Sequence, residues 1–379
     1  MTTRSAPGVL ITGAAVLSAF GRGMGALAAG LDAGRPAFAP VQRFDVTGRR
    51  VGVAAAMPGD PDLAAELAAL VEEACDEAKL STPERAGAAL FLAVHGDPRL
   101  ARSDPADRRR FGGTAFAAAL AGGAGLGAAR AYTAACVAAS TAIADAAGIV
   151  ARGEADRVVV AGGYLVEADQ FALFDAGRAL AADGAVRPFS AGRRGLLLGD
   201  GAGAVVVESA AAARERGVEP LAALAGWGRA GDAHHPCQPH PHGRGLARAI
   251  AAALRRAGVG PGEVGYVNAH GSGTEQSDAA EAEALHAALG EHAAAVPVSS
   301  TKALHGQALE ASGVLELAVT LHALRGGRLP VNAGFVAPDE RCPLDLVLGG
   351  ARAASPAYAL TLNAAFGGAN TALLLGAPS

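Results

Sequence analysis

Short apolar runs that end near small residues alternate with helical stretches along this chain, and this alternation most constrains the fold. The runs predict buried strands, at residues 9–13, 88–94, 157–163, 199–208, 264–270, 296–300, 358–362 and 371–375. Helical periodicity is found between them, at residues 25–31, 64–79, 116–126, 137–150, 246–257 and 310–324. No linker, low-complexity tract or charged tail interrupts the pattern. The sequence therefore predicts an α/β protein.

Composition excludes several functional classes. The chain has 379 residues and a formal net charge of −4, so it offers no basic footprint for nucleic acid and no polybasic membrane patch. No run approaches the ~20 apolar residues of a membrane span. Its four cysteines follow no disulfide or metal spacing, which indicates free thiols in a reducing compartment. We expect a cytoplasmic protein of enzyme size, with no nucleic-acid or membrane partner.

One cysteine lies among very small residues, where an extended segment gives way to a helix. Cys136 is at the centre of the sequence Tyr-Thr-Ala-Ala-Cys-Val-Ala-Ala-Ser, residues 132–140. Unpaired N–H groups and the positive end of the helix dipole favour a thiolate there. The small neighbours leave room for a substrate. A buried structural cysteine is the alternative interpretation, and it fits most lone cysteines.

Four positions at strand or turn ends are candidates for one common site: Cys136, His270, Lys302 and the turn 366–368. Ligands and chemistry in α/β proteins gather at the carboxyl ends of strands. A cysteine with a histidine supplies a nucleophile and a base for acyl transfer through a thioester. Histidine also donates a hydrogen bond to a developing enolate, and an N–H of the turn would complete an oxyanion hole.

Six blocks of sequence carry a family resemblance. They are Thr-Ala-Ala-Cys136, Asn268-Ala-His-Gly-Ser-Gly-Thr274 with Asp278, Ser299-Ser-Thr-Lys302, Arg187-Pro-Phe-Ser190, Leu198-Gly-Asp-Gly-Ala-Gly203 and Pro338-Asp-Glu-Arg-Cys-Pro-Leu-Asp345. With these blocks the chain resembles the elongating β-ketoacyl-acyl-carrier-protein synthases (ketosynthases) of fatty-acid and type II polyketide synthesis. The resemblance extends from residue 9 to residue 375.

The resemblance implies a thiolase fold, in which two similar α/β halves pack in five layers, αβαβα. Residues 1–218 would form the half that carries the nucleophile, and residues 219–379 the half that carries the histidine and the lysine. Members of the family dimerise through the strand that precedes the nucleophile. We therefore expect a homodimer, or a heterodimer with a ketosynthase paralogue, and an acyl carrier protein as a further partner.

The resemblance also implies the catalytic roles. Cys136 would accept an acyl group from the phosphopantetheine of an acyl carrier protein or of coenzyme A, and no further cofactor is needed. His270 would support decarboxylation and stabilise the enolate. Lys302 and Glu316 would hold the network of the active site.

Binding roles follow from the same resemblance. Ser272 and Thr274 would hydrogen-bond the phosphopantetheine arm. Phe366 would be the gating phenylalanine, and its N–H and that of the nucleophile would form the oxyanion hole. Gly367 and Gly368 would contact the substrate.

One departure affects the chemistry. The family pattern Lys-x-x-x-Gly-His here ends in Gln307, and a histidine, His305, lies two residues earlier. Glutamine donates an N–H but carries no proton or charge. His305 could reach the site instead, although helix geometry turns it about 200° away from the position of Gln307.

Three functions are therefore weighed. The first is decarboxylative condensation of an acyl group with a malonyl carrier, and the retained histidine and lysine favour it. The second is acyl transfer or hydrolysis without decarboxylation, which Gln307 favours. The third is a non-catalytic chain-length partner subunit, although such relatives typically lack the cysteine. The sequence does not name the acyl chain.

Further departures concern the pocket and the partner. The region 92–132 is shorter than usual in the family, and Ala364 and Ala365 replace an aromatic residue before Phe366. The helix at 64–79 is acidic where relatives that bind carrier proteins are often basic. The arginines at 108–110 would serve an acidic carrier instead, or form a solvated charge run.

A segment rich in histidine is also a candidate metal site. Residues 232–242 contain four histidines and one cysteine, which are zinc-ligand types. Prolines on both sides of His240 hamper a compact tetrahedral set. We expect no metal.

Overall fold

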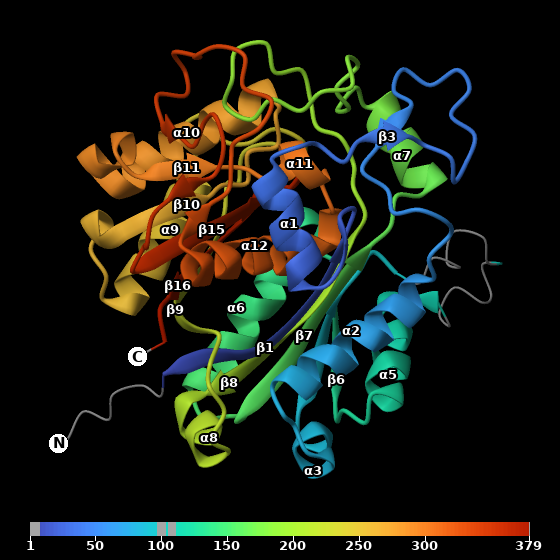
Figure 1. Cartoon of the computed structure of the whole chain (residues 1–379), viewed down its shortest axis with the longest axis vertical. Coiled ribbons are helices and arrows are strands. Elements are labelled where there is room, and N and C mark those ends of the chain that lie inside the picture. The colour runs from blue at the N-terminus through green and yellow to red at the C-terminus, as the bar shows by residue number, and fades with distance from the viewer. Residues whose placement is uncertain (1–7, 97–103, 105–110, 379) are drawn as a thin grey trace.

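The computed structural model describes residues 8–96, 104 and 111–378. The arginine run predicted at 108–110 lies outside the described residues. In the described part of the chain, one large sheet has the strand order β13-β11-β10-β15-β16-β9-β1-β8-β7-β5-β6. Some helices cover the outer faces of this sheet, and others lie between its two halves (Figure 1).

The chain builds the same unit twice. The first unit consists of β1 (Val9–Ser18), α2 (Leu63–Glu77), β5 (Ala89–Ala93), α5 (Gly113–Gly123), β6 (Ala129–Tyr132), α6 (Ala138–Ala151), β7 (Arg157–Tyr164) and β8 (Gly201–Ser209). The second consists of β9 (Ala222–Gly231), α9 (Arg244–Ala257), β10 (Val264–Asn268), α10 (Glu275–Leu289), β11 (Pro297–Ser299), α12 (Ser312–Gly326), β15 (Tyr358–Ala364) and β16 (Ala369–Gly376).

The two units share their strand pairing. In the first, β1 pairs antiparallel with β8 and β8 with β7, whereas β7, β5 and β6 are parallel. In the second, β9 pairs antiparallel with β16 and β16 with β15, whereas β15, β10 and β11 are parallel. The units join where Leu10 and Ile11 of β1 pair with β9. The chain passes from one unit to the other between α8 (Ala210–Glu215) and β9.

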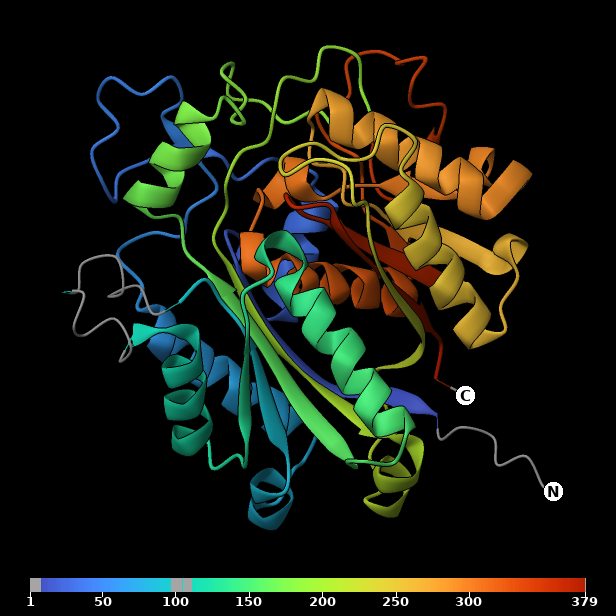
Figure 2. The same cartoon turned by 180° about the vertical axis from the view of Figure 1, so that it is seen from behind.

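Helices form three of the five layers. α2 and α5 cover the outer face of the first unit, α9 and α10 cover the outer face of the second, and α6 and α12 lie between the two halves of the sheet (Figures 1 and 2). The predicted αβαβα arrangement is confirmed.

Small residues allow the central layer to form. Half of the residues of α6 are alanine, and strands from both halves of the sheet pack on it together with α12. At its crossing with α12 the backbones nearly touch, since a Cβ added to Gly313 would lie 2.2 Å from the Ser140 nitrogen. The outer helix α2 instead exposes Glu72, Glu73 and Asp76, which confirms its predicted acidic face.

Shorter elements complete the chain. They are β2 (Gly21–Arg22), α1 (Met24–Ala33), β3 (Ala39–Pro40), β4 (Val53–Ala54), α3 (Thr82–Ala86), η2 (Ala135–Val137), α7 (Ala168–Ala176), η3 (Pro261–Glu263), η4 (Gly290–Ala294), α11 (Lys302–His305), η5 (Leu309–Ala311), β12 (Arg328–Leu329), β13 (Asp345–Leu346) and β14 (Arg352–Ala353). Among the described helices, none combines the length and the apolar character that crossing a membrane requires.

Predicted boundaries differ from the structure by a few residues. The strand predicted at 9–13 continues to Ser18 because it pairs with β8 along its whole length. The helix predicted at 310–324 begins at Ser312 because residues 309–311 form a separate 3₁₀ turn. The glycines of β8 permit close packing: a Cβ on Gly201 would lie 2.7 Å from the Cβ of Ala308.

Candidate active site

Both units contribute to one pocket of about 610 Å³. Six of the residues predicted from sequence line it: Cys136, His270, Ser272, Thr274, Gln307 and Phe366. Lys302 and Glu316 do not line it, but Lys302 bonds to the backbone of His270. Gly367 and Gly368 do not line it either. With φ of +88° and +75°, they form the tight turn that joins β15 to β16.

Cys136 is presented by a sharp turn between strand and helix. It is the middle residue of η2, directly before α6, and the preceding Ala135 has a φ of +49°. Alanine rarely adopts this left-handed backbone, and such strain is found most often at functional sites. The turn therefore holds the sulfur at the wall of the pocket.

The Cys136 thiol is harder to ionise than its place before a helix predicts. Burial raises its pKa to about 11, against the opposing effects of a hydrogen bond with the Gln307 side chain and the charge of Lys302. Removal from water disfavours the charged thiolate and is the largest of these effects. Correcting the expectation from sequence, the thiol is protonated at neutral pH, so a base must accept its proton during reaction.

His270 has the properties of such a base. It follows β10, and its own N–H donates to Glu281 Oε1 at 2.7 Å. Burial, together with the charge of Lys302, lowers the ring pKa well below its ordinary value, so the ring is neutral at neutral pH. Among the described residues, ring nitrogen Nδ1 has no hydrogen-bond partner. The ring is therefore free to accept a proton.

A buried ion pair lies behind His270. Lys302 Nζ pairs with Glu316 and also donates to the His270 carbonyl at 2.6 Å. Glu316 accepts a further hydrogen bond from Asn363. Burying two charges is costly unless their hydrogen bonds are made, and here each ion has a second partner. The pair fixes the backbone that carries the histidine ring.

Gln307, and not His305, reaches the pocket. The Gln307 side chain lines the pocket with Cys136 and lowers the pKa of its thiol, and Gln307 Oε1 has no partner among the described residues. The His305 ring is buried, with Nδ1 donating to the Gly306 carbonyl at 2.9 Å and Nε2 accepting from Thr301 at 2.8 Å. The short helix α11 turns His305 away, so the alternative in which it serves the site is not supported.

Two carboxylates of α10 hold the loop that carries the predicted binding hydroxyls. Glu281 Oε2 accepts from the Gly271 N–H at 2.7 Å, and Asp278 Oδ1 accepts from the Gly273 N–H at 3.1 Å. The hydroxyl oxygens of Ser272 and Thr274 lie 3.1 Å apart. The backbone of this loop is thereby fixed, and both hydroxyls lie at the pocket wall.

Phe366 also lines the pocket. Its side chain is exposed, with its ring centroid 6.1 Å from that of Phe174. Among the described residues, no hydrogen-bond acceptor is found for the N–H of Phe366 or of Cys136. Both N–H groups thus remain available to a substrate oxygen.

The histidine-rich segment forms a wall of the pocket and offers no metal centre. Within the described residues, no three histidine, cysteine or acidic side chains are grouped to hold a metal ion. His235 Nδ1 instead accepts from the N–H of Cys237, and Asp232 accepts from the N–H groups of His240 and Gly245. Cys237 lines the same pocket as Cys136.

Comparison with known proteins identifies the family. The model described as "Beta-ketoacyl synthase, N-terminal domain" matches residues 115–213, and "Beta-ketoacyl synthase, C-terminal domain" matches residues 221–336. Together they cover more than half of the 379 residues. The chain belongs to the β-ketoacyl synthase family.

Individual relatives agree with this assignment. The 3-oxoacyl-[acyl-carrier-protein] synthase 2 of Staphylococcus aureus is 37% identical over 246 residues, which span 63% of this chain and 61% of the relative. A solved ishigamide ketosynthase/chain length factor superposes with a TM-score of 0.90 at 29% identity, over 99% of this chain and 100% of that one. A β-ketoacyl synthase from Burkholderia phymatum STM815 gives 0.90 at 26% identity, over 98% and 100%. The fold is the thiolase fold.

Three buried residues that support this site were not predicted from the sequence. Glu281, Asn363 and Glu310 are all buried beside it, and none was named from the sequence. The spacing of Asp278 and Glu281, three residues apart on one helix, is a signal that both face the same way. Asn363 and Glu310 carry no comparable signal, because their partners lie far away in the sequence.

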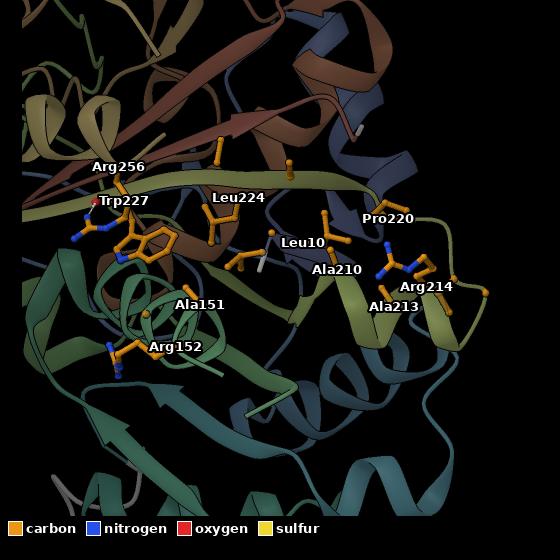
Figure 3. A pocket seen from close by; sticks show the side chains of 17 residues that line it. Leu10, Ala151, Arg152, Ala210, Ala213, Arg214, Pro220, Leu224, Trp227 and Arg256 are labelled. Atoms are coloured by element: carbon orange, nitrogen blue, oxygen red, sulfur yellow. Dashed lines mark hydrogen bonds between the residues drawn. The ribbon is translucent and has the colours of Figure 1, made fainter. Parts of the chain in front are cut away.

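A second pocket, of about 900 Å³, lies at the far end of α6 from Cys136 (Figure 3). Arg152, Arg214, Arg256 and Trp227 are among its lining residues, and the Arg256 guanidinium lies 4.8 Å from the Trp227 ring centroid. None of the predicted site residues lines it.

Proposed function

We propose that this protein is a condensing enzyme of the ketosynthase type. Cys136 forms an acyl thioester, which then undergoes decarboxylative Claisen condensation with a malonyl carrier in polyketide or fatty-acid synthesis. The observation that carries the proposal is the convergence of Cys136, His270 and Gln307 on one pocket. The S. aureus relative is named for this reaction, and the match spans 61% of its length.

Acylation comes first. The Cys136 sulfur attacks the carbonyl carbon of a carrier thioester while the neutral His270 ring accepts the thiol proton. The N–H groups of Cys136 and Phe366 stabilise the oxyanion. The C–S bond to the carrier then breaks, and its leaving thiolate takes the proton from His270. No cofactor is required, because phosphopantetheine arrives with the substrate.

Condensation follows on the acylated enzyme. The bond between the malonyl α-carbon and its carboxylate breaks, carbon dioxide leaves, and His270 and Gln307 donate hydrogen bonds to the enolate oxygen. The enolate carbon attacks the acyl carbonyl, and Cys136 leaves as the thiolate. If the amide of Gln307 stabilises the enolate less well than a histidine, one weakened hydrogen bond costs roughly 3 kcal/mol, or about a hundredfold in rate.

Two surfaces support the proposed partners. Arg178 and Arg194 line the pocket and suit the phosphate of an acyl carrier protein's arm. β6 is an edge strand in the described sheet and pairs with β5 on one side. Its open edge suits a second copy or a paralogue, as expected from the resemblance.

Mass spectrometry tests the first step. The full chain is incubated with acyl carrier or acyl-coenzyme A thioesters and then digested with a protease. We expect the acyl mass increment on the peptide that contains Cys136, and none for Cys136→Ala. Labelling of Cys75, Cys237 or Cys342 in place of Cys136 would overturn the assignment.

Carbon dioxide release tests the second step and separates the two enzymatic candidates. Gln307 is the observation that favours transfer or hydrolysis without decarboxylation, because it replaces a proton carrier. We expect the acylated native protein to release labelled carbon dioxide from a malonyl carrier. If the native protein is acylated but releases no carbon dioxide, and Gln307→His does release it, the native protein carries out simple acyl transfer.

A further inference from the structure

The second pocket combines apolar surface with positive charge (Figure 3). Its volume of about 900 Å³ is in the range of small-molecule sites. Val9, Leu10 and Leu224 are among its apolar lining residues, and alanines and glycines surround them. Among the described residues that line it, the only polar side chains are those of Arg152, Arg214, Arg256 and Trp227, and none is acidic. A molecule bound there therefore meets apolar surface and positive charge together.

Donors from two arginines and the tryptophan lie together at one end of this pocket. A Cβ added to Gly148 of α6 would lie 3.2 Å from Arg152 Nη1 and 4.0 Å from Trp227 Nε1, so both nitrogens border the space that this glycine leaves open. The Arg256 guanidinium lies 4.8 Å from the Trp227 ring centroid. Figure 3 shows these three side chains at one end of the pocket and Arg214 at the other.

The three side chains retain donors for a ligand. Arg152 pairs with Glu154 through Nε and Nη2, which leaves its Nη1 without a partner among the described residues. Arg256 donates to the Trp227 carbonyl through Nη1, and no acidic side chain in the described part of the chain pairs with it. Trp227 Nε1 has no acceptor among the described residues either. Guanidinium and indole N–H groups only donate hydrogen bonds, so their partner must be an acceptor.

We propose that the second pocket binds an amphipathic carboxylate, a molecule that carries one carboxylate group on an apolar chain. The carboxylate accepts hydrogen bonds from Arg152, Trp227 and Arg256, and two of these are charge-assisted. The apolar chain lies against Leu10 and Leu224, where it is removed from water. None of these residues lines the pocket of Cys136, so this ligand binds independently of acylation.

Other classes of ligand fit this pocket less well. A cation would meet three arginines and no acidic lining residue among those described. A neutral alcohol fills the apolar part but forms only the weaker, uncharged type of hydrogen bond at its head. A doubly charged phosphate would be repelled more strongly by Glu154, which already pairs with Arg152. A singly charged carboxylate is therefore the head group that these charges favour.

Tryptophan fluorescence tests the site directly, because Trp227 is the only tryptophan in the chain. The full chain is titrated with decanoate, and decanol and decyl phosphate provide neutral and phosphorylated heads on a chain of equal length. We expect decanoate to change the emission of Trp227 in a saturable way. Decanol should bind about tenfold more weakly, as expected for the loss of one charge-assisted hydrogen bond. Decyl phosphate should also bind more weakly than decanoate.

Arginine variants locate the carboxylate. Arg152→Gln and Arg256→Gln each remove one charged donor, and we expect each to weaken decanoate about tenfold while the affinity for decanol stays unchanged. Arg255→Gln is the matched control. It removes the same charge from the neighbouring residue of α9, which does not line the pocket, and it should keep the native affinity for decanoate.

Four results would overturn the inference. An emission that decanoate leaves unchanged would show that no such ligand reaches Trp227. Equal affinities for decanoate and decanol would show that the arginines do not bind the head group. Tighter binding of decyl phosphate would assign the pocket to a phosphate in place of a carboxylate. An equal loss of decanoate affinity in Arg255→Gln and Arg256→Gln would reduce the effect to overall charge.

Discussion

At the scale of single residues, the environment determines which protonation state each reactive group adopts. The Cys136 thiol has its pKa raised to about 11 by burial, and the His270 ring has its pKa lowered by burial and by the charge of Lys302. Both shifts favour the neutral form, so the resting pair is thiol and imidazole. Proton transfer between them accompanies attack on the substrate instead of preceding it.

The thiol should therefore react slowly with an alkylating agent at neutral pH. A raised pKa means that the thiolate fraction grows only as the pH approaches 11, so the iodoacetamide rate at Cys136 should still be rising at pH 9. Gln307→Ala removes the hydrogen bond that lowers this pKa and should slow alkylation further. Peptide mass spectrometry follows the modified site. A rate that levels off near pH 7 would contradict this prediction.

The buried pair behind His270 should show strong coupling between its two members. Lys302→Met leaves the carboxylate of Glu316 buried without its cation, and we expect a loss of about 3–5 kcal/mol in the free energy of unfolding. Adding Glu316→Gln should recover part of the loss, because no unpaired charge remains. Urea denaturation of the single and double variants measures the coupling free energy between Lys302 and Glu316. Additive losses would show that the pair is not coupled.

At the scale of elements, the central helices depend on backbone contact. α6 and α12 cross where Gly313 meets Ser140, and both helices lie between the two halves of the sheet. This contact sets the spacing between η2 and η5, which precede the two helices and present Cys136 and Glu310. The geometry of the site therefore depends on a glycine that does not line the pocket.

A methyl group at the crossing should be destabilising. Gly313→Ala places a Cβ 2.2 Å from the Ser140 nitrogen, and we expect a loss of about 1–3 kcal/mol in the free energy of unfolding. Gly326→Ala, at the end of the same helix, meets no atom nearer than 3.5 Å and should be neutral or stabilising by up to about 1 kcal/mol. Thermal or urea unfolding compares them. Equal effects would argue against the close crossing.

At the scale of the whole molecule, the two units contribute different residues to one active site. The first supplies the nucleophile, and the second supplies His270, Lys302 and Gln307. Neither unit alone encloses the pocket, because its walls come from both. In the described sheet, β6 is an edge strand that pairs with β5 alone.

We expect a dimer through that edge. Light scattering at micromolar concentration should give twice the 37.3 kDa mass of the chain, or the mass of a heterodimer when a ketosynthase paralogue is co-expressed. Ala131→Pro removes an N–H that faces the open edge of β6, since the alternate residues Ala128 and Tyr132 bond to β5, and it should shift the protein towards monomer. A monomer in the native protein would contradict the prediction.

Sequence alone predicted the class of fold, most elements to within a few residues, and six of the residues that line the pocket. These depend on local hydrophobic periodicity and on short motifs, which are properties of neighbouring residues. Tertiary structure alone decided the rest. Burial raised the pKa of Cys136, and buried hydrogen bonds to Thr301 and to the Gly306 carbonyl hold the His305 ring outside the pocket. Glu310 lies beside the nucleophile because two turns far apart in the chain pack together, which no local pattern encodes.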